Sequence, residues 1–136
     1  MNAVALAGGG ARGAFQIGVW KALKELGYEF SIVTGVSVGA LNAAIFAVDD
    51  FEAGVEAWEN ITTSKVLDIE EELVTLENPK RVNNLVREVV RKGGISYKGL
   101  EELLRKYVDE DKVRASGIDV GILTVKLPGF KPVAVF

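Results

Sequence analysis

Ser37 has the clearest chemical setting of any residue in the chain, because it lies in the pattern Gly35-Val36-Ser37-Val38-Gly39. A G-x-S-x-G pattern is typical of a nucleophile elbow when a strand precedes it and a helix follows it. The turn is tight, so the residues two before and two after the serine must be small, and Gly35 and Gly39 meet that need. The serine would then sit at the helix N-terminus, which favours developing negative charge. The alternative is that Ser37 only caps the helix and that both glycines serve packing.

A second glycine pattern, Gly8 to Gly13, directly follows an apolar run. Consecutive glycines at Gly8, Gly9 and Gly10 leave backbone N–H groups unshielded and able to point at an anion. In a hydrolase such a loop is an oxyanion hole, in which one donor is worth about 3 kcal/mol of the barrier. If the loop binds no ligand, it is only a turn that leads into a helix.

The same letters also match G-x-G-x-x-G, the dinucleotide-binding fingerprint. That fingerprint needs an acidic residue at a strand end about 20 residues later, and only the poorly placed Glu29 is available. Arg12 lies inside the loop. It can cap carbonyls or pair with a carboxylate, as most arginines do, but we expect it to steady the loop or attract an anionic head group.

The composition excludes several kinds of chemistry. The 136 residues contain no Cys and no His, which excludes disulfides, thiolate and imidazole metal sites, and a Ser-His-Asp triad. Acid–base work is left to Asp, Glu, Lys or Tyr. The net charge of −3, without a basic run, gives no basis for nucleic-acid binding. We expect no metal and no cofactor, and we interpret the acidic run at residues 70–72 as a solvated face.

The N-terminal third has the pattern of a strand–helix–strand unit. Residues 3–7 are a short apolar run typical of a strand covered on both faces, and residues 31–34 are a second β-branched run. Between them, residues 14–26 place apolar side chains on one helical stripe. Such a unit predicts two adjacent parallel strands.

The rest of the chain predicts more helices and a hairpin. Residues 38–48 predict a slim, buried helix in which Asn42 is the only strongly polar residue, and residues 51–61 predict an amphipathic surface helix. Residues 62–78 show no clear pattern. Further on we predict a helix opened by Asn78-Pro79 and ended by Gly93-Gly94, a helix capped by Ser96 that reaches Tyr107, and strands at 118–127 and 131–136 around Pro128-Gly129.

These elements predict one α/β domain over residues 1–136, a three-layer α/β/α sandwich with a largely parallel central sheet. No apolar run reaches the roughly 18 residues that span a bilayer, and the N-terminus lacks the features of a signal peptide, so we expect a cytoplasmic location. The chain stops within an apolar strand at Phe136. We therefore expect the domain to continue beyond that residue.

The paired glycine motifs resemble those of the patatin-like phospholipases. The segment Phe15–Val19 between the motifs and Asn42-Ala43-Ala44 behind them fit the same family. The resemblance implies a lipid acyl hydrolase that uses a Ser–Asp dyad, which suits a chain without His. It implies Ser37 as nucleophile and an oxyanion loop made by Gly8, Gly9, Gly10 and Arg12. The implied substrate is an acyl lipid or other ester, taken at a membrane surface without a transmembrane segment.

The family's general base is an Asp in an Asp-Gly-Gly or Asp-Gly-Ala motif, and this chain has no Asp-Gly pair. We expect the base to lie beyond residue 136 and the chain by itself to be a poor catalyst. Two alternatives stay open, a non-catalytic lipid- or anion-binding module and a nucleotide-binding βαβ protein. None of the aspartates has the motif's neighbours, and they are Asp49, Asp50, Asp68, Asp109, Asp111 and Asp119.

Overall fold

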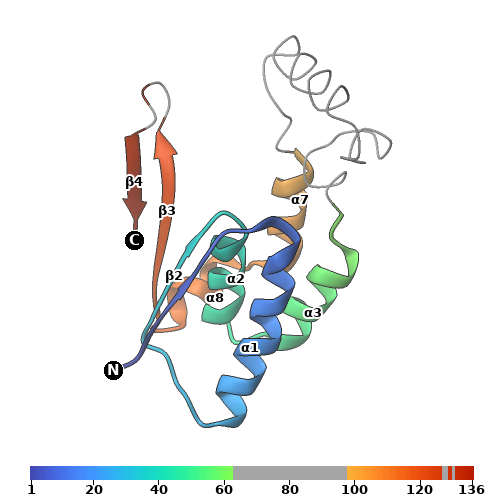
Figure 1. Ribbon diagram of the computed structural model, residues 1–136, viewed down its shortest axis with the longest axis vertical. Helices are drawn as coiled ribbons and strands as arrows, with labels where there is room; N and C mark the ends of the chain where they lie inside the picture. Colours follow the sequence, from blue (N-terminus) through green and yellow to red (C-terminus); the bar gives the residue numbers. More distant parts are fainter. Residues whose placement is uncertain (63–97, 127–128, 130) are drawn as a thin grey trace. The chain divides into compact units, whose positions relative to one another are not determined.

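The computed structural model describes residues 1–62, 98–126, 129 and 131–136 (Figure 1). The chain divides into two units, one made of Met1–Trp58 with Tyr107–Phe136 and the other of Glu59–Lys106. The first unit contains both glycine motifs. The helix expected after Asn78-Pro79 lies outside the described residues, as does the run at residues 70–72.

A four-stranded sheet forms the first unit's frame, in the order β1-β2-β3-β4. The two strands β1 (Ala3–Leu6) and β2 (Ile32–Val36) pair in parallel, as the sequence predicts. Strand β3 (Asp119–Lys126) also runs parallel to β2, and β4 (Lys131–Val135) returns antiparallel to β3. The α/β class with a mostly parallel sheet is therefore confirmed.

The register of the sheet brings both glycine motifs to one edge. Leu6, at the end of β1, pairs with Gly35 of β2. Since the two strands are parallel, the loop after β1 and the turn after β2 leave the sheet at the same carboxyl edge. A short 3-10 helix, η1 (Gly10–Arg12), follows the first loop and leads into α1 (Gly13–Glu25).

Helix α2 (Val38–Ala47) is the central helix of this unit and packs across β1, β2 and β3. Its small side chains allow the close approach that the sequence predicts. Ala43 and Ile45 are fully buried, and Phe46 stacks on Trp20 of α1 with ring centroids 4.2 Å apart. This packing holds α1 and α2 together at the end of α2 that is remote from Ser37.

The other helices among the described residues are α3 (Phe51–Asn60), α7 (Lys98–Tyr107) and α8 (Glu110–Ala115). The sequence predicts α3 and α7, and α3 exposes its acidic side chains as expected. It does not predict α8, because six residues are too few to show a helical period. The carboxylate of Asp109 caps that helix by accepting a hydrogen bond from the Lys112 backbone N–H at 3.2 Å.

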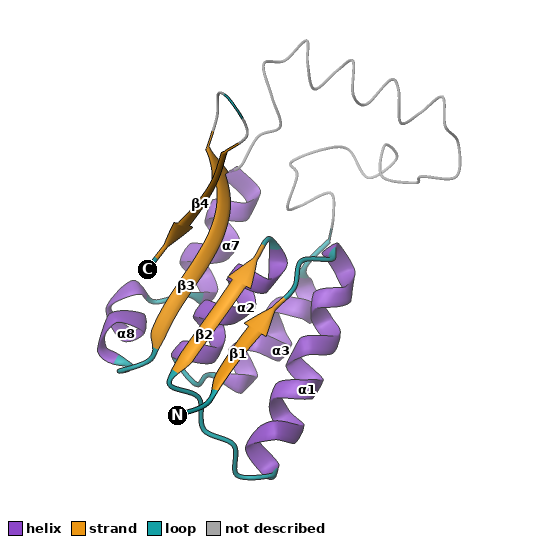
Figure 2. Cartoon of the chain, turned by 60° about the vertical axis from the view of Figure 1, so that its left-hand side comes forward, coloured by secondary structure: helices purple, strands orange, loops and turns teal. Residues whose placement is uncertain are grey.

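The sheet has two faces with different surroundings. Figure 2 shows α1, α2 and α3 behind the sheet. On the opposite face the described residues leave a shallow hollow of about 370 Å³, lined by side chains such as Thr34, Val36 and Leu123. The third layer of the predicted sandwich stays a prediction. Among the described helices none is long and apolar enough to cross a membrane.

Candidate active site

Ser37 forms the turn between β2 and α2, which is the strand–turn–helix setting that an elbow needs. Its backbone has φ 56° and ψ −128°. Residues with a side chain avoid this region, and holding one there costs about 1–3 kcal/mol. The surrounding fold must therefore impose this conformation on the serine.

The two glycines flanking the turn are required by sterics, as predicted. A Cβ atom on Gly35 would collide with the Gly39 carbonyl oxygen, and a Cβ on Gly39 would collide with the Leu6 carbonyl oxygen. Both obstacles are backbone atoms, which cannot move aside as a flexible side chain can. The close approach of β1, β2 and α2 at this turn thus depends on glycine at both positions.

Helix capping does not explain Ser37. The residue occupies the N-cap position of α2, yet its side chain makes no capping hydrogen bond. Serine is common at N-caps because its oxygen accepts from a backbone N–H of the first turn. Here the hydroxyl makes no such bond. Capping therefore does not explain why a serine occupies this strained position.

The first glycine of the loop lies against the serine. A Cβ built on Gly8 would stand 3.1 Å from Ser37 Cβ and 3.8 Å from Ser37 Oγ. Beyond it, Gly9 has φ 155° and Gly10 has φ 56°, conformations that favour glycine. The structure thus brings together Ser37 and the start of the glycine loop, as the sequence predicts. The roles of Gly9 and Gly10 as hydrogen-bond donors stay predictions.

Arg12 ends η1 and is exposed to solvent. Its backbone N–H donates to the Gly9 carbonyl at 3.2 Å, which closes the loop. Within the part of the chain that the structure describes, no hydrogen bond or ion pair engages its guanidinium. The ordinary partners that the sequence allows for, a carbonyl or a surface carboxylate, are not seen there.

A buried polar network behind the loop was not predicted from the sequence. Asn42 of α2 is 0% exposed, and its Nδ2 donates to the Gly13 carbonyl at 3.0 Å and to Gln16 Oε1 at 2.8 Å. Trp58 Nε1 of α3 donates to Asn42 Oδ1 at 2.9 Å. Gln16 Nε2 donates to the Ala7 carbonyl at 2.7 Å. The one available signal was Asn42 as the lone polar residue of an apolar helix.

Three described aspartates lie toward the other edge of the sheet. Asp119 begins β3, opposite Ile32 at the start of β2. Asp49 pairs with Lys24 after the C-terminus of α2, and Asp50 caps α3 through the Ala53 N–H at 2.9 Å. Asp68 lies outside the described residues. None of these three described aspartates is placed to take a proton from Ser37.

The dinucleotide alternative loses support because its only candidate acidic residue also lies at the wrong edge of the sheet. A ribose-binding acid must follow the second strand at its carboxyl end. Glu29 instead precedes β2, at the amino edge, and the residue that follows β2 is Ser37.

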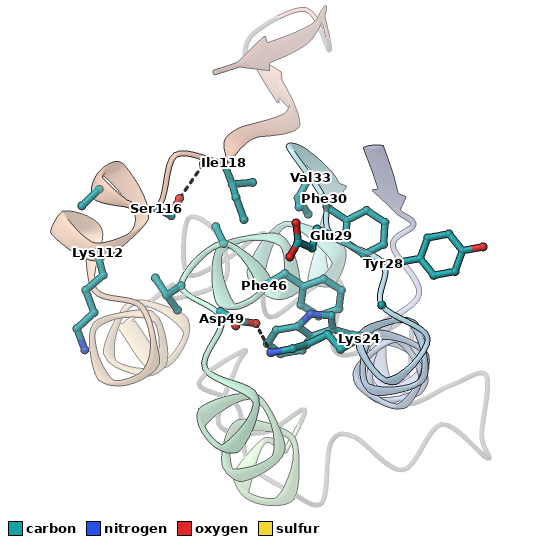
Figure 3. Close-up of a pocket in the computed structure, with 15 residues that line it drawn as sticks. Lys24, Tyr28, Glu29, Phe30, Val33, Phe46, Asp49, Lys112, Ser116 and Ile118 are labelled. Atoms are coloured by element: carbon teal, nitrogen blue, oxygen red, sulfur yellow. Dashed lines mark hydrogen bonds and ion pairs between the residues drawn. The ribbon is translucent and has the colours of Figure 1, made fainter. Parts of the chain in front are cut away.

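A cavity of about 630 Å³ opens at the amino edge of the sheet (Figure 3). Its walls include Trp20, Phe46, Tyr28 and Phe30, and the Lys24–Asp49 ion pair lies at its border. None of the predicted site residues lines it. The described residues also contain no group of three acidic, His or Cys side chains that could hold a metal ion.

Comparisons with known proteins agree with this geometry. Lysophospholipase nte1 of Aspergillus terreus is 54% identical over 44 residues, which is 32% of this chain and 3% of the relative. Patatin-like phospholipase domain-containing protein 7 of Rattus norvegicus is 50% identical over 48 residues, 34% of this chain and 4% of the relative. A patatin-like phospholipase domain-containing protein of Caenorhabditis elegans, ZK370.4, is 41% identical over 71 residues, 47% of this chain and 5% of the relative.

The chain thus spans only a few per cent of the length of these curated relatives. No solved structure matches it. The family profile described as patatin-like phospholipase matches residues 4–134, nearly the whole chain. With the paired glycine motifs at one edge of a mostly parallel sheet, this match shows that the chain belongs to the patatin-like phospholipase family.

Proposed function

We propose that this chain carries the nucleophile and oxyanion loop of a serine acyl hydrolase that cleaves carboxyl esters of lipids. Membership of the phospholipase family supports a lipid hydrolase. The single observation that carries the assignment of Ser37 is its geometry. The serine is strained, makes no cap to its helix, and lies against Gly8 of the glycine loop.

The chemistry would follow the acyl-enzyme route. Ser37 Oγ attacks the ester carbonyl carbon, and its proton passes to a general base. The carbonyl oxygen becomes an oxyanion, which backbone N–H groups of Gly8, Gly9 and Gly10 and the N-terminus of α2 stabilise. Collapse breaks the ester C–O bond, the alcohol leaves with the proton, and the acyl group stays on Ser37. Water then attacks the acyl-enzyme and releases the fatty acid.

The general base would be the aspartate of the Ser–Asp dyad that the family resemblance implies. Three of the described aspartates, Asp49, Asp50 and Asp119, do not lie beside Ser37. A positioned base contributes about 10²–10⁴-fold to the rate. We therefore expect the 136-residue chain to hydrolyse esters slowly by itself, and a longer protein with an Asp-Gly-Gly segment to be faster by about that factor.

A second candidate is a lipid- or anion-binding module without catalysis. The exposed guanidinium of Arg12, which engages no group within the described residues, supports it. In the hydrolase the same residue would attract the anionic head group of a substrate at a membrane surface. The two candidates therefore share a ligand and differ only in whether Ser37 reacts.

A fluorophosphonate probe separates the two candidates. We expect the chain to be labelled covalently at Ser37, with the modified peptide identified by mass spectrometry. Ser37→Ala should abolish labelling, and Ser31→Ala, a matched control directly before β2, should leave it unchanged. Labelling that survives in Ser37→Ala contradicts the nucleophile assignment. A chain that stays unlabelled on prolonged incubation with excess probe, yet still binds anionic vesicles, supports the binding module instead.

A further inference from the structure

We infer that Asn42 and Gln16 are positioning residues that fix the direction of the first oxyanion donor, the N–H of Gly8. This inference rests on the proposed function, because it concerns the same glycine loop. It comes from the buried network behind the loop, which neither the nucleophile nor the oxyanion assignment accounts for.

The network runs across three helices to the end of β1. Trp58 of α3 donates to Asn42 of α2 at 2.9 Å, and Asn42 donates to Gln16 of α1 at 2.8 Å. Gln16 then donates to the Ala7 carbonyl at 2.7 Å, immediately before Gly8. No buried side-chain nitrogen or oxygen among the described residues lacks a hydrogen-bond partner. Each buried polar side-chain atom of the network therefore has at least one partner.

The direction of these bonds is set at both ends. An indole N–H can only donate, so Trp58 must face the Oδ1 of Asn42. The Nδ2 of Asn42 then faces Oε1 of Gln16, which turns Nε2 of Gln16 toward Ala7. A backbone carbonyl can only accept, so this last bond fits only that orientation. Both side-chain amides are thus held in one orientation, because flipping either one would place two donors or two acceptors against each other.

The last bond acts on the peptide between Ala7 and Gly8. This unit is planar and trans, so the Gly8 N–H points opposite to the Ala7 carbonyl. By holding that carbonyl, Gln16 sets the plane of the peptide and hence the direction of the N–H. Gly8 is also the loop residue that lies against Ser37. An oxyanion donor is effective only when it aims at the position that the oxyanion will occupy.

Stability alone does not call for an amide at position 42. Asn42 is fully buried in a helix whose buried members are otherwise apolar or glycine. Replacing both partners of a hydrogen bond by apolar groups of similar shape can be nearly neutral for folding, whereas a change at Asn42 alone leaves the Trp58 N–H and the Gly13 carbonyl without their partner. The same network also places Trp58 against Gly13, where an added Cβ would stand 2.5 Å from its Cζ2. This contact adds to the anchoring of the loop's end.

The test compares rates of fluorophosphonate labelling at Ser37 in the full chain. Asn42→Leu removes both donors of the amide, and Gln16→Met removes the bond to Ala7 at a half-buried position that tolerates an apolar side chain. We expect each to slow the maximal labelling rate constant by about 10-fold or more, because one misdirected oxyanion donor affects the chemical step. The probe concentration at half-maximal rate should change little.

Asp109→Ala is the matched control, since it weakens a helix cap on α8 without touching the network. If a general loss of stability slowed the labelling of Ser37, all three variants would be slowed alike. If the parent is not labelled at Ser37, the proposed function and this inference both fall. If the parent is labelled and Gln16→Met, folded by circular dichroism, reacts with the parent's maximal rate constant, only the positioning role is overturned.

Discussion

At the scale of single residues, Ser37 holds a conformation that its own chemistry disfavours. Its φ of 56° suits glycine, yet a hydroxyl stands there. Strain of this kind persists where surrounding structure imposes it, and it clusters at functional sites. The elbow around it depends on backbone contacts that leave no room for a Cβ at Gly35 or Gly39.

Ser37→Gly should stabilise the protein while removing its reactivity. Glycine relieves the strain, partly offset by its greater freedom in the unfolded chain, so the free energy of unfolding should rise by about 1 kcal/mol. Ser37→Ala keeps the Cβ and should change stability little. Urea denaturation of the three proteins measures the difference. A glycine variant less stable than the alanine variant would contradict the strain.

Two glycine-to-alanine changes in helices should have opposite effects. In Gly39→Ala the new Cβ meets the Leu6 carbonyl, and we expect a loss of about 3 kcal/mol or more. Gly18→Ala, in α1, meets no atom within 4 Å and should stabilise by roughly 0.5–1 kcal/mol. Thermal unfolding followed by circular dichroism gives both values, and equal shifts would argue against the close packing of β1 and α2.

At the scale of elements, helix ends determine how the chain enters and leaves the sheet. Helix α2 starts at the candidate nucleophile and ends near the cavity at the other edge. Helix α8 is only six residues long and precedes β3. Helices this short gain little from propensity, so their caps matter more.

Asp109→Ala should destabilise α8 by about 1 kcal/mol, because the carboxylate accepts the Lys112 N–H. Asp109→Asn keeps an acceptor and should retain most of that stability. Asp111→Ala, which removes an acid from the same first turn without removing the cap, should cost less. The three midpoints of urea unfolding test this order, and a larger effect at Asp111 would show that charge near the helix N-terminus outweighs the cap.

At the scale of the whole described sheet, two edges carry two different sets of groups. The carboxyl edge bears Ser37 and the glycine loop, and the amino edge bears the cavity of Figure 3 and several acidic residues. Five positions of β2 separate the level of Asp119 from Ser37, which corresponds to about 17 Å. Direct proton transfer over that distance is not feasible.

Asp119→Asn and Asp49→Asn should therefore leave the labelling rate of Ser37 within about two-fold of the parent, whereas loss of a general base costs about 10²–10⁴-fold. The same fluorophosphonate assay measures it. A drop of a hundredfold in either variant would identify a base among the aspartates and overturn the expectation that the chain lacks one.

The local features of this protein follow from the amino-acid pattern. Strand–helix–strand order follows from the spacing of apolar residues, and parallel strands bring Gly8 and Ser37 to the same edge. Small residues at Gly35 and Gly39 follow from the sterics of a tight turn. Each of these depends on interactions over a few residues or on a general rule of connection, so a linear pattern contains the information.

The groups that lie behind the loop depend instead on tertiary packing. Trp58, Asn42 and Gln16 come from three helices, and their hydrogen bonds depend on how those helices pack. The pattern marked Asn42 as a polar residue in an apolar helix but could not say which groups it would face. The direction of an amide is set by partners distant in sequence, and no local spacing encodes those partners.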